Sequence, residues 1–152
     1  MTAQRLFCFG LGYTGLRLAH AARALGWQVA GTCRTAENRE RLRQAGIAAY
    51  VFDGSAPMAD AAAALAGSTL LLCSVPPDAE SDPVLRLHRD DIGALAGTLR
   101  WIGLLSTSGV YGDCGGAWID ESRQPSPLTG DNRRRVEAEQ AWLDLGAEHA
   151  IP

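Results

Sequence analysis

The stretch FCFGLGYTGLRLA, residues 7–19, decides the fold that we expect of this chain. It joins an apolar run of strand type to a helix-like segment through the turn GLGYTG, which has the pattern GxGxxG. Such a turn between a strand and a helix is typical of a dinucleotide-binding unit. Gly10 permits the tight turn, Gly12 lets the backbone approach a pyrophosphate, and Gly15 lets the helix pack closely on the strand. The alternative is an ordinary strand-to-helix turn.

The rest of the chain alternates between the same two kinds of segment. Apolar runs of strand type are followed by segments in which apolar residues recur at helical spacing. We expect strands at residues 5–10, 27–34, 47–53, 68–75 and 100–108, and helices at 13–26, 35–46, 58–67, 84–99 and 131–146. This alternation predicts an α/β fold, a Rossmann-type doubly wound parallel sheet with helices on both faces.

The last residues, 147–152 (AEHAIP), have the pattern of the start of a sixth strand. Because a Rossmann sheet has such a strand, we expect a chain that is truncated before or within it. Residues 1–152 would then form an NAD(P)-binding domain, and the C-terminal substrate-binding portion would be absent.

Composition excludes several classes of protein. A chain of 152 residues, 47% hydrophobic and 20% charged, has the length and balance of one globular domain with a core. Its net charge of −3 gives no indication of a nucleic-acid or anionic-membrane partner. No apolar run approaches the roughly 18 to 20 residues that span a bilayer. The first residues also lack the pattern of a secretory signal, so we expect a cytoplasmic protein.

The cysteines and histidines show no spacing of a metal site, and we expect no metal. The four cysteines have no CxxC pairing, and three of them lie in strand-like runs, so buried thiols are expected rather than disulfides. They are Cys8, Cys33, Cys73 and Cys114. All 14 basic residues are arginine, which excludes any mechanism that needs a lysine of this chain.

The end of the second expected strand bears on which nucleotide binds. An NAD site usually places an acidic residue there for the ribose 2′-hydroxyl, whereas this chain has Arg34 between a cysteine and a threonine. An arginine beside a small polar residue suits a 2′-phosphate, so NADP is favoured over NAD. The alternative is a solvated arginine. Other cofactor contacts are expected at the helix N-terminus and beyond the strand ends: Tyr13, Thr14, Asp53, Ser74, Val75 and Pro76.

The segment LLSTSGVYGD, residues 104–113, resembles the extended short-chain dehydrogenase/reductase family, the NAD(P)-dependent sugar-nucleotide epimerases and dehydratases. In that family the fifth strand ends in a Ser-Ser/Thr run that Val-Tyr-Gly follows. The loop AWIDESRQPSP, residues 117–127, and the helix around Glu139 also resemble theirs. The resemblance covers essentially the whole chain. It implies an oxidoreductase or epimerase that acts on a sugar nucleotide or another small carbonyl substrate, and a possible homodimer.

By this resemblance, Thr107 matches the catalytic serine or threonine, whose hydroxyl binds the substrate oxygen that gains or loses a proton. Ser108 and Tyr111 are expected in the substrate pocket.

The family completes its site with Tyr-x-x-x-Lys on the fifth helix, and this chain departs from that pattern. Arg135 stands at the lysine position and Asp131 at the tyrosine position, and no tyrosine follows Tyr111. The resemblance therefore implies an atypical active site with Thr107, Asp131 and Arg135 as candidate catalytic residues. The run of arginines at 133–135 equally fits a solvated helix face.

Two other functions stay open. One is a non-catalytic NAD(P)-binding sensor that kept the nucleotide site without the tyrosine–lysine pair. The other is a different GxGxxG dehydrogenase, such as a hydroxyacid type, whose catalytic residues lie in a second domain. The segment STSGVYGD argues against the second.

Overall fold

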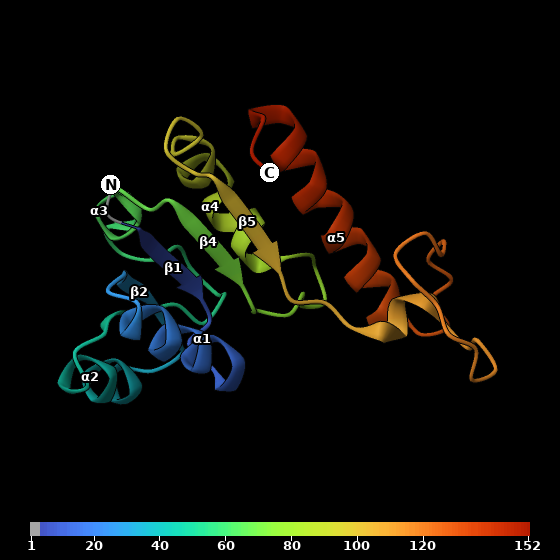
Figure 1. The fold of residues 1–152 in the computed structure, drawn as a ribbon, viewed down its shortest axis with the longest axis horizontal. Helices are drawn as coiled ribbons and strands as arrows, with labels where there is room; N and C mark the ends of the chain where they lie inside the picture. The colour runs from blue at the N-terminus through green and yellow to red at the C-terminus, as the bar shows by residue number, and fades with distance from the viewer. Residues whose placement is uncertain (1–3) are drawn as a thin grey trace.

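Strands and helices alternate along the chain in the expected order (Figure 1). The computed structural model describes residues 4–152. The elements are β1 (Arg5–Phe9), α1 (Tyr13–Ala24), β2 (Gln28–Cys33), α2 (Ala36–Gln44), β3 (Ala48–Val51), α3 (Ala61–Leu65), β4 (Leu70–Cys73), α4 (Pro83–Gly93), β5 (Trp101–Leu104), a 3-10 helix η1 (Ser108–Tyr111) and α5 (Gly130–His149).

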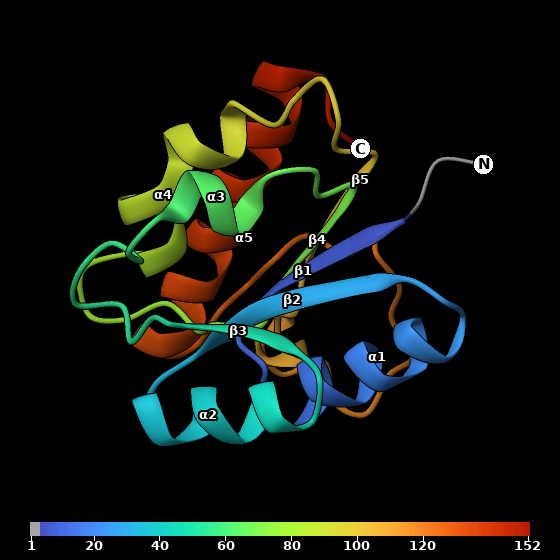
Figure 2. The same cartoon turned by 90° about the vertical axis from the view of Figure 1, so that its left-hand side faces the viewer.

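The strands form one parallel sheet in the order β3-β2-β1-β4-β5. The helices α1 and α2 cover one face, and α3, α4 and α5 cover the other (Figure 2). The predicted doubly wound α/β fold is thus confirmed. The chain runs outward from β1 to β3 and then restarts on the other side of β1 with β4. Ligands of such sheets lie at this reversal point, beyond the carboxyl ends of the strands.

The central strand β1 shows why the strands are continuously apolar. Phe7 and Phe9 belong to the core under α3, α4 and α5, while Leu6 and Cys8 belong to the core under α1 and α2. Successive side chains of a strand point to opposite faces, and here both faces are covered. All four side chains are at most 2% exposed.

The C-terminal residues differ from the sequence-based expectation. Residues 147–149 continue α5 instead of starting a strand, so the prediction of a strand over 147–152 was wrong there. Alanine and glutamate at 147 and 148 are good helix formers and prolong the helix. Ala150 then ends it in the left-handed region, with a φ of 52°. The Ile102 backbone N–H donates to the Pro152 carbonyl at 2.8 Å, which places the last residue beside β5.

Within residues 4–152, no helix is both long and apolar enough to cross a membrane.

Candidate dinucleotide site

The glycine turn after β1 is held from both neighbouring strands. The Gly10 N–H donates to Thr32 Oγ1 at 2.9 Å, and the Leu11 N–H donates to the Thr32 carbonyl at 2.7 Å. From the other side, Ser74 Oγ donates to the Gly10 carbonyl at 2.8 Å. Thr32 is buried at the end of β2, and Ser74 follows β4. The backbone of the turn is therefore fixed at the reversal point of the sheet.

The three glycines of the turn meet three different steric demands. Gly10 has a φ of +94°, which favours glycine. A Cβ on Gly15 would overlap the Gly10 carbonyl oxygen, so α1 packs directly on the turn. A Cβ on Gly12 would meet no described atom within 4 Å. Gly12 thus borders open space, where a ligand can approach the backbone.

The N-terminus of α1 differs from those of α2, α4 and α5. The N-cap residues of those helices are Thr35, Asp82 and Thr129, whose side chains accept from backbone N–H groups of the first turn. The N-cap residue of α1 is Gly12, which supplies no side-chain cap, and the described first turn of α1 has no acidic residue. Uncapped N–H groups at the positive end of a helix dipole suit a phosphate.

A hollow of about 510 Å³ lies beyond the carboxyl ends of β1 to β4. Seven of the predicted cofactor residues line it: Gly10, Gly12, Arg34, Asp53, Ser74, Val75 and Pro76. Sequence reasoning missed other lining residues, among them Asn38 and Asp78. Both lie in polar segments that carry no motif. Only the parallel packing of the strands brings these segments together.

A second hollow, of about 290 Å³, adjoins the first because Gly12 and Ser74 line both. Tyr13 and Thr14 line it, and so does Arg135 from α5. Arg135 Nη1 donates to the Leu105 carbonyl at 3.2 Å, which fixes the guanidinium near the glycine turn. The structure thus brings Arg135 to the hollow at the N-terminus of α1.

The residues after β5 form η1, whereas the sequence-based expectation placed Ser108 at the end of the fifth strand and residues 109–111 in a loop. Thr107 caps η1, since its Oγ1 accepts from the Gly109 N–H at 3.3 Å. Thr107 and Ser108 are exposed, and Tyr111 is partly buried. Asn132 of α5 lies against η1, because a Cβ on Gly109 would fall 2.7 Å from its side-chain amide. Within LLSTSGVYGD, the N-cap threonine was the local signal for this turn.

Asp131 is placed differently from Arg135. Its side chain is 86% exposed and forms an ion pair with Arg134. It is not among the described side chains that line either hollow. Because positions 131 and 135 are one helical turn apart, the two residues share a side of α5, but only Arg135 reaches the hollow.

Among the residues that line the hollow of about 510 Å³, Arg34 and Asp53 have opposite charges and Cys33 is neutral. Asp53 Oδ1 accepts from the Ser55 hydroxyl at 2.7 Å and from the Ser55 N–H at 2.9 Å, which lowers the pKa of Asp53 and keeps it ionised. Burial raises the pKa of the Cys33 thiol, so that Cys33 stays neutral. Arg34 is exposed beside it. Arg34 and Asp53 thus place a cation and a carboxylate in the lining, together with the neutral thiol of Cys33.

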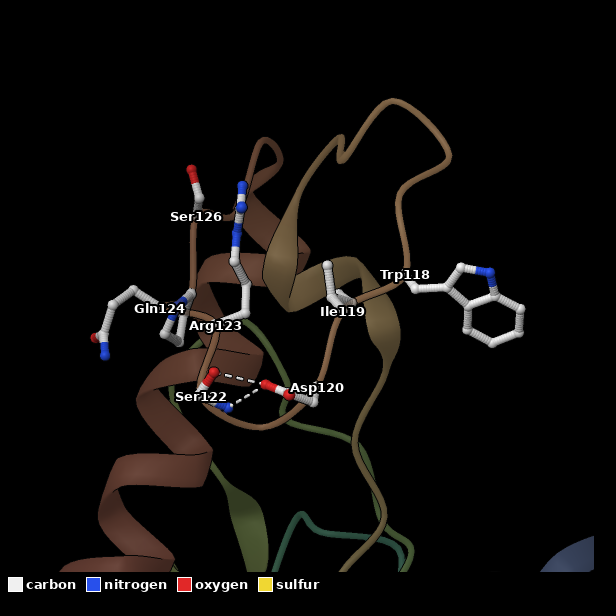
Figure 3. A pocket seen from close by; sticks show the side chains of 8 residues that line it. Trp118, Ile119, Asp120, Ser122, Arg123, Gln124 and Ser126 are labelled. Atoms are coloured by element: carbon white, nitrogen blue, oxygen red, sulfur yellow. Dashed lines mark hydrogen bonds between the residues drawn. The ribbon is translucent and has the colours of Figure 1, made fainter.

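A further hollow, of about 890 Å³, lies in the loop around residues 118–126 (Figure 3). This single exposed loop supplies all of its described lining, and the fully exposed side chain of Trp118 points away from the other labelled side chains. Asp120 Oδ1 accepts a hydrogen bond from the Ser122 hydroxyl at 2.6 Å, which lowers the pKa of Asp120. No element of the sheet borders this hollow, so it is a weaker candidate for the site.

No group of three His, Cys, Asp or Glu side chains that suits a metal occurs in the described part of the chain.

Comparison with known proteins shows similar chains that are about twice as long. No protein-family model matches this chain. It is 30% identical over 142 residues to protein YeeZ of Escherichia coli strain K12, a match that covers 88% of this chain and 51% of YeeZ. The structure of a functionally unknown conserved protein from Silicibacter pomeroyi DSS is 40% identical, with a TM-score of 0.81; the match covers 94% of this chain and 49% of that protein.

More distant structures show the same fold. A mutant UDP-glucuronic acid 4-epimerase from Bacillus cereus, in complex with UDP-4-deoxy-4-fluoro-glucuronic acid and NAD, superposes with a TM-score of 0.73 at 17% identity. The match covers 98% of this chain and 54% of the epimerase. Other neighbours are epimerases and a short-chain dehydrogenase/reductase superfamily protein, again matched over about half their length. The chain therefore has the Rossmann-type fold of the epimerase and short-chain dehydrogenase/reductase structures and spans about half the length of these proteins.

Proposed function

We propose that this chain is the NADP-binding part of an oxidoreductase or epimerase of the extended short-chain dehydrogenase/reductase type. One observation carries the proposal. The glycine turn, the uncapped N-terminus of α1 and the ends of β2, β3 and β4 border two adjoining hollows, which share Gly12 and Ser74. That is the arrangement that a dinucleotide with a central pyrophosphate requires.

The preference for NADP over NAD depends on Arg34. It follows buried Cys33 at the end of β2 and lines the hollow. Its neighbour Thr35 is engaged as the cap of α2, since its Oγ1 accepts from the Asn38 N–H at 3.2 Å. The end of β2 thus presents a guanidinium where an NAD site presents a carboxylate, and a guanidinium matches a phosphate group.

The substrate proposed is a sugar nucleotide or another small carbonyl compound. When bound, a nicotinamide cofactor supplies hydride transfer. In this proposal Thr107 binds the reacting oxygen of the substrate, and Ser108 and Tyr111 line its pocket. Arg135 binds the cofactor as a permanent cation, because a guanidinium does not give up its proton in proteins. A cytoplasmic location and a homodimer are parts of the same proposal.

The position of Asp131 favours a second candidate, a non-catalytic NAD(P)-binding sensor. The side chain at the position of the family's tyrosine is exposed and paired with Arg134. A proton acceptor should instead lie within hydrogen-bond reach of the substrate. A sensor of this kind would bind the dinucleotide, and Asp131 would not act as a proton acceptor.

Calorimetric titration of the purified chain with NADPH and NADH tests the cofactor. We expect tighter binding of NADPH, and loss of that preference in Arg34→Ala. Arg43→Ala is the matched control, because Arg43 is exposed in the last turn of α2 and the substitution removes the same charge. Equal affinity for both cofactors, or an unchanged preference in Arg34→Ala, contradicts the NADP assignment.

Turnover of NADP(H) over a panel of carbonyl and sugar-nucleotide substrates separates the enzyme from the sensor. The enzyme predicts turnover that Thr107→Ala reduces by about 10²–10⁴-fold, the range of a positioned proton-transfer group. Tight cofactor binding without turnover, in a protein that carries the full length of its relatives, favours the sensor.

A further inference from the structure

Two loops border the hollow around Asp53. The first follows β3 and contains Asp53 and Gly54, and the second covers residues 76–82 after β4. Asp53 lines the hollow from the first loop, and Pro76, Pro77 and Asp78 line it from the second. Neither loop has a backbone ladder to the other in the described structure. Side-chain contacts therefore decide how far apart they lie.

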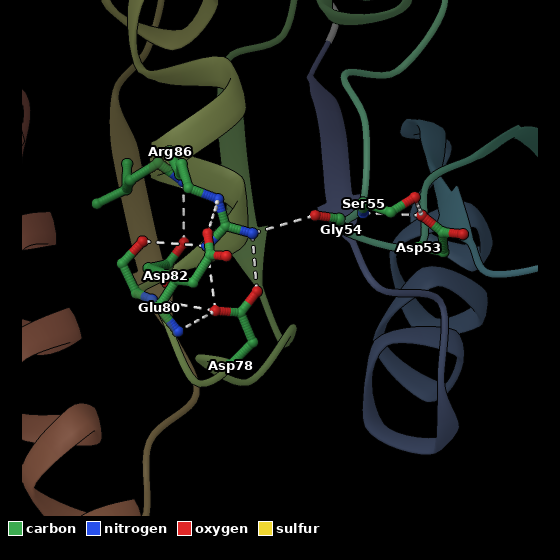
Figure 4. Close-up of polar contacts among 9 residues, drawn as sticks. Asp53, Gly54, Ser55, Asp78, Glu80, Asp82 and Arg86 are labelled. Carbon is green, nitrogen blue, oxygen red and sulfur yellow. Dashed lines mark hydrogen bonds and ion pairs between the residues drawn. The ribbon is translucent and has the colours of Figure 1, made fainter.

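Arg86 of α4 joins the two loops (Figure 4). Its Nη2 donates to the Gly54 carbonyl at 3.2 Å, and its Nη1 and Nη2 donate to the two carboxylate oxygens of Asp78 at 3.0 and 2.8 Å. Asp78 Oδ1 also accepts from the N–H groups of Glu80 and Ser81, at 2.8 and 3.0 Å. One guanidinium thus holds the loop after β3 and closes the turn after β4.

Charge and packing strengthen this arrangement. A two-pronged arginine–carboxylate pair is stronger and more directional than a neutral hydrogen bond. The bond to Arg86 holds the pKa of Asp78 well below its ordinary value, so the pair stays ionised at neutral pH. Gly54, with a φ of +89°, packs on Pro83 at the start of α4, where a Cβ on Gly54 would lie 3.2 Å from the Pro83 Cβ. Both loops are therefore anchored to α4.

We propose that Arg86 is a positioning residue for the adenine end of the nucleotide, an inference that rests on the proposed dinucleotide function. Arg86 is absent from the described lining of the hollow and acts through the loops that form the wall. A wall that is ordered before the ligand arrives lowers the ordering cost of binding. Arg34, which is proposed to bind the 2′-phosphate of the adenosine half, lines this same hollow. The other hollow, beside Arg135, has no described lining residue from either loop, so binding of the nicotinamide half should not depend on Arg86.

Titration with the two halves of the cofactor tests the proposal. Arg86→Met is compared with Arg89→Met, a matched loss of charge on the same helix, where Arg89 pairs with Glu148 of α5 at 2.8 Å. We expect adenosine 2′,5′-bisphosphate, the adenosine half of NADP, to bind Arg86→Met at least about tenfold more weakly than the wild type, which corresponds to the ordering of one or two side chains. Nicotinamide mononucleotide should bind all three proteins equally. An equal loss for both halves, or unchanged affinity for adenosine 2′,5′-bisphosphate, overturns the proposal.

Hydrogen exchange without nucleotide provides a second readout. In Arg86→Met, the amides of residues 53–55 and 78–81 should exchange faster than in Arg89→Met, while those of β1 keep their protection. Unchanged exchange in the two loops overturns the role of Arg86 whatever the affinities are. A wild type that binds neither adenosine 2′,5′-bisphosphate nor NADPH refutes the proposed function itself, and the exchange comparison still decides whether Arg86 holds the loops.

Discussion

Gly12 and Gly15 lie three residues apart, yet substitution should impair ligand binding at Gly12 and the stability of the fold at Gly15. Gly12 faces open space, whereas a Cβ on Gly15 would overlap the Gly10 carbonyl. The difference follows from position alone, because the two residues are chemically identical. Packing of the fold therefore requires glycine at position 15, whereas the proposed ligand requires it at position 12.

We predict that Gly12→Ala folds with a free energy of unfolding within about 1 kcal/mol of the wild type but loses NADPH binding, since the new methyl group fills the approach to the backbone. Gly15→Ala should lower the free energy of unfolding by about 1–3 kcal/mol, as expected of overpacking. Chemical denaturation and calorimetry measure both quantities. Gly97→Ala is the control, because its Cβ also meets no described atom but lies outside the hollows. NADPH binding by Gly12→Ala would contradict the assignment.

The four thiols should differ in reactivity. Burial raises the pKa of Cys8 to about 12 and raises that of Cys33 and Cys73 as well, while Cys114 is partly exposed on a loop. Only the thiolate reacts. We predict that a colorimetric disulfide reagent at about pH 7.5 modifies one thiol quickly in the native protein and four after denaturation. Cys114→Ser should abolish the fast phase, and more than one fast thiol would contradict the buried positions.

At the scale of elements, a buried carboxylate connects α4 to α5. Asp82 Oδ1 caps α4 by accepting from the Leu85 N–H at 2.9 Å, and its Oδ2 accepts from Trp142 Nε1 at 2.9 Å. Asp82 and Trp142 are 4% and 5% exposed. One side chain thus stabilises the start of one helix and satisfies the indole of the other.

We predict that Asp82→Ala lowers the free energy of unfolding by about 2–4 kcal/mol, because it removes a cap and leaves a buried donor without its acceptor. Thr129→Ala, which removes only the exposed cap of α5, should cost about 1 kcal/mol. Chemical denaturation of these two variants measures both losses. Denaturation of Trp142→Phe and of the double variant Asp82→Ala/Trp142→Phe measures the coupling free energy between Asp82 and Trp142. Additive effects of Asp82→Ala and Trp142→Phe would contradict a direct interaction between the two side chains.

At the scale of the whole molecule, residues at the ends of all five described strands and Arg135 of α5 line the two hollows, so a nucleotide that fills them would contact most of this sheet edge. A ligand that binds only the folded state stabilises the whole domain. Saturating NADPH, at 100 times its Kd, should raise the free energy of unfolding by about 2.7 kcal/mol. For a domain of this size that corresponds to an increase in Tm of roughly 5–10 °C.

Thermal unfolding with NADPH and with NADH at equal concentration measures this effect. NADH should raise the Tm less than NADPH, and Arg34→Ala should remove the difference, whereas Arg43→Ala should retain it. An equal increase for both cofactors in the wild type would contradict the role of Arg34. No increase with either cofactor would contradict a dinucleotide site.

Local spacing along the chain was enough to predict the parallel doubly wound sheet and the glycine turn. Alternation of apolar runs with helical spacing depends only on neighbouring residues, and GxGxxG encodes its turn within six positions. That the residues after the strands line one hollow could be predicted because parallel strands bring their carboxyl ends to one edge. The residues 147–149 were misassigned because helix propensity and strand pattern conflict over so short a segment.

The tertiary structure decided everything that depends on contacts between distant segments. Thr32 and Ser74 hold the glycine turn from two other strands, and Arg86 joins the loops after β3 and β4. The same holds for the two candidate catalytic residues of α5, since Arg135 reaches the Leu105 carbonyl while Asp131 pairs with Arg134 in solvent. No local pattern encodes such contacts, because their geometry is set by how helices and strands pack after each has formed.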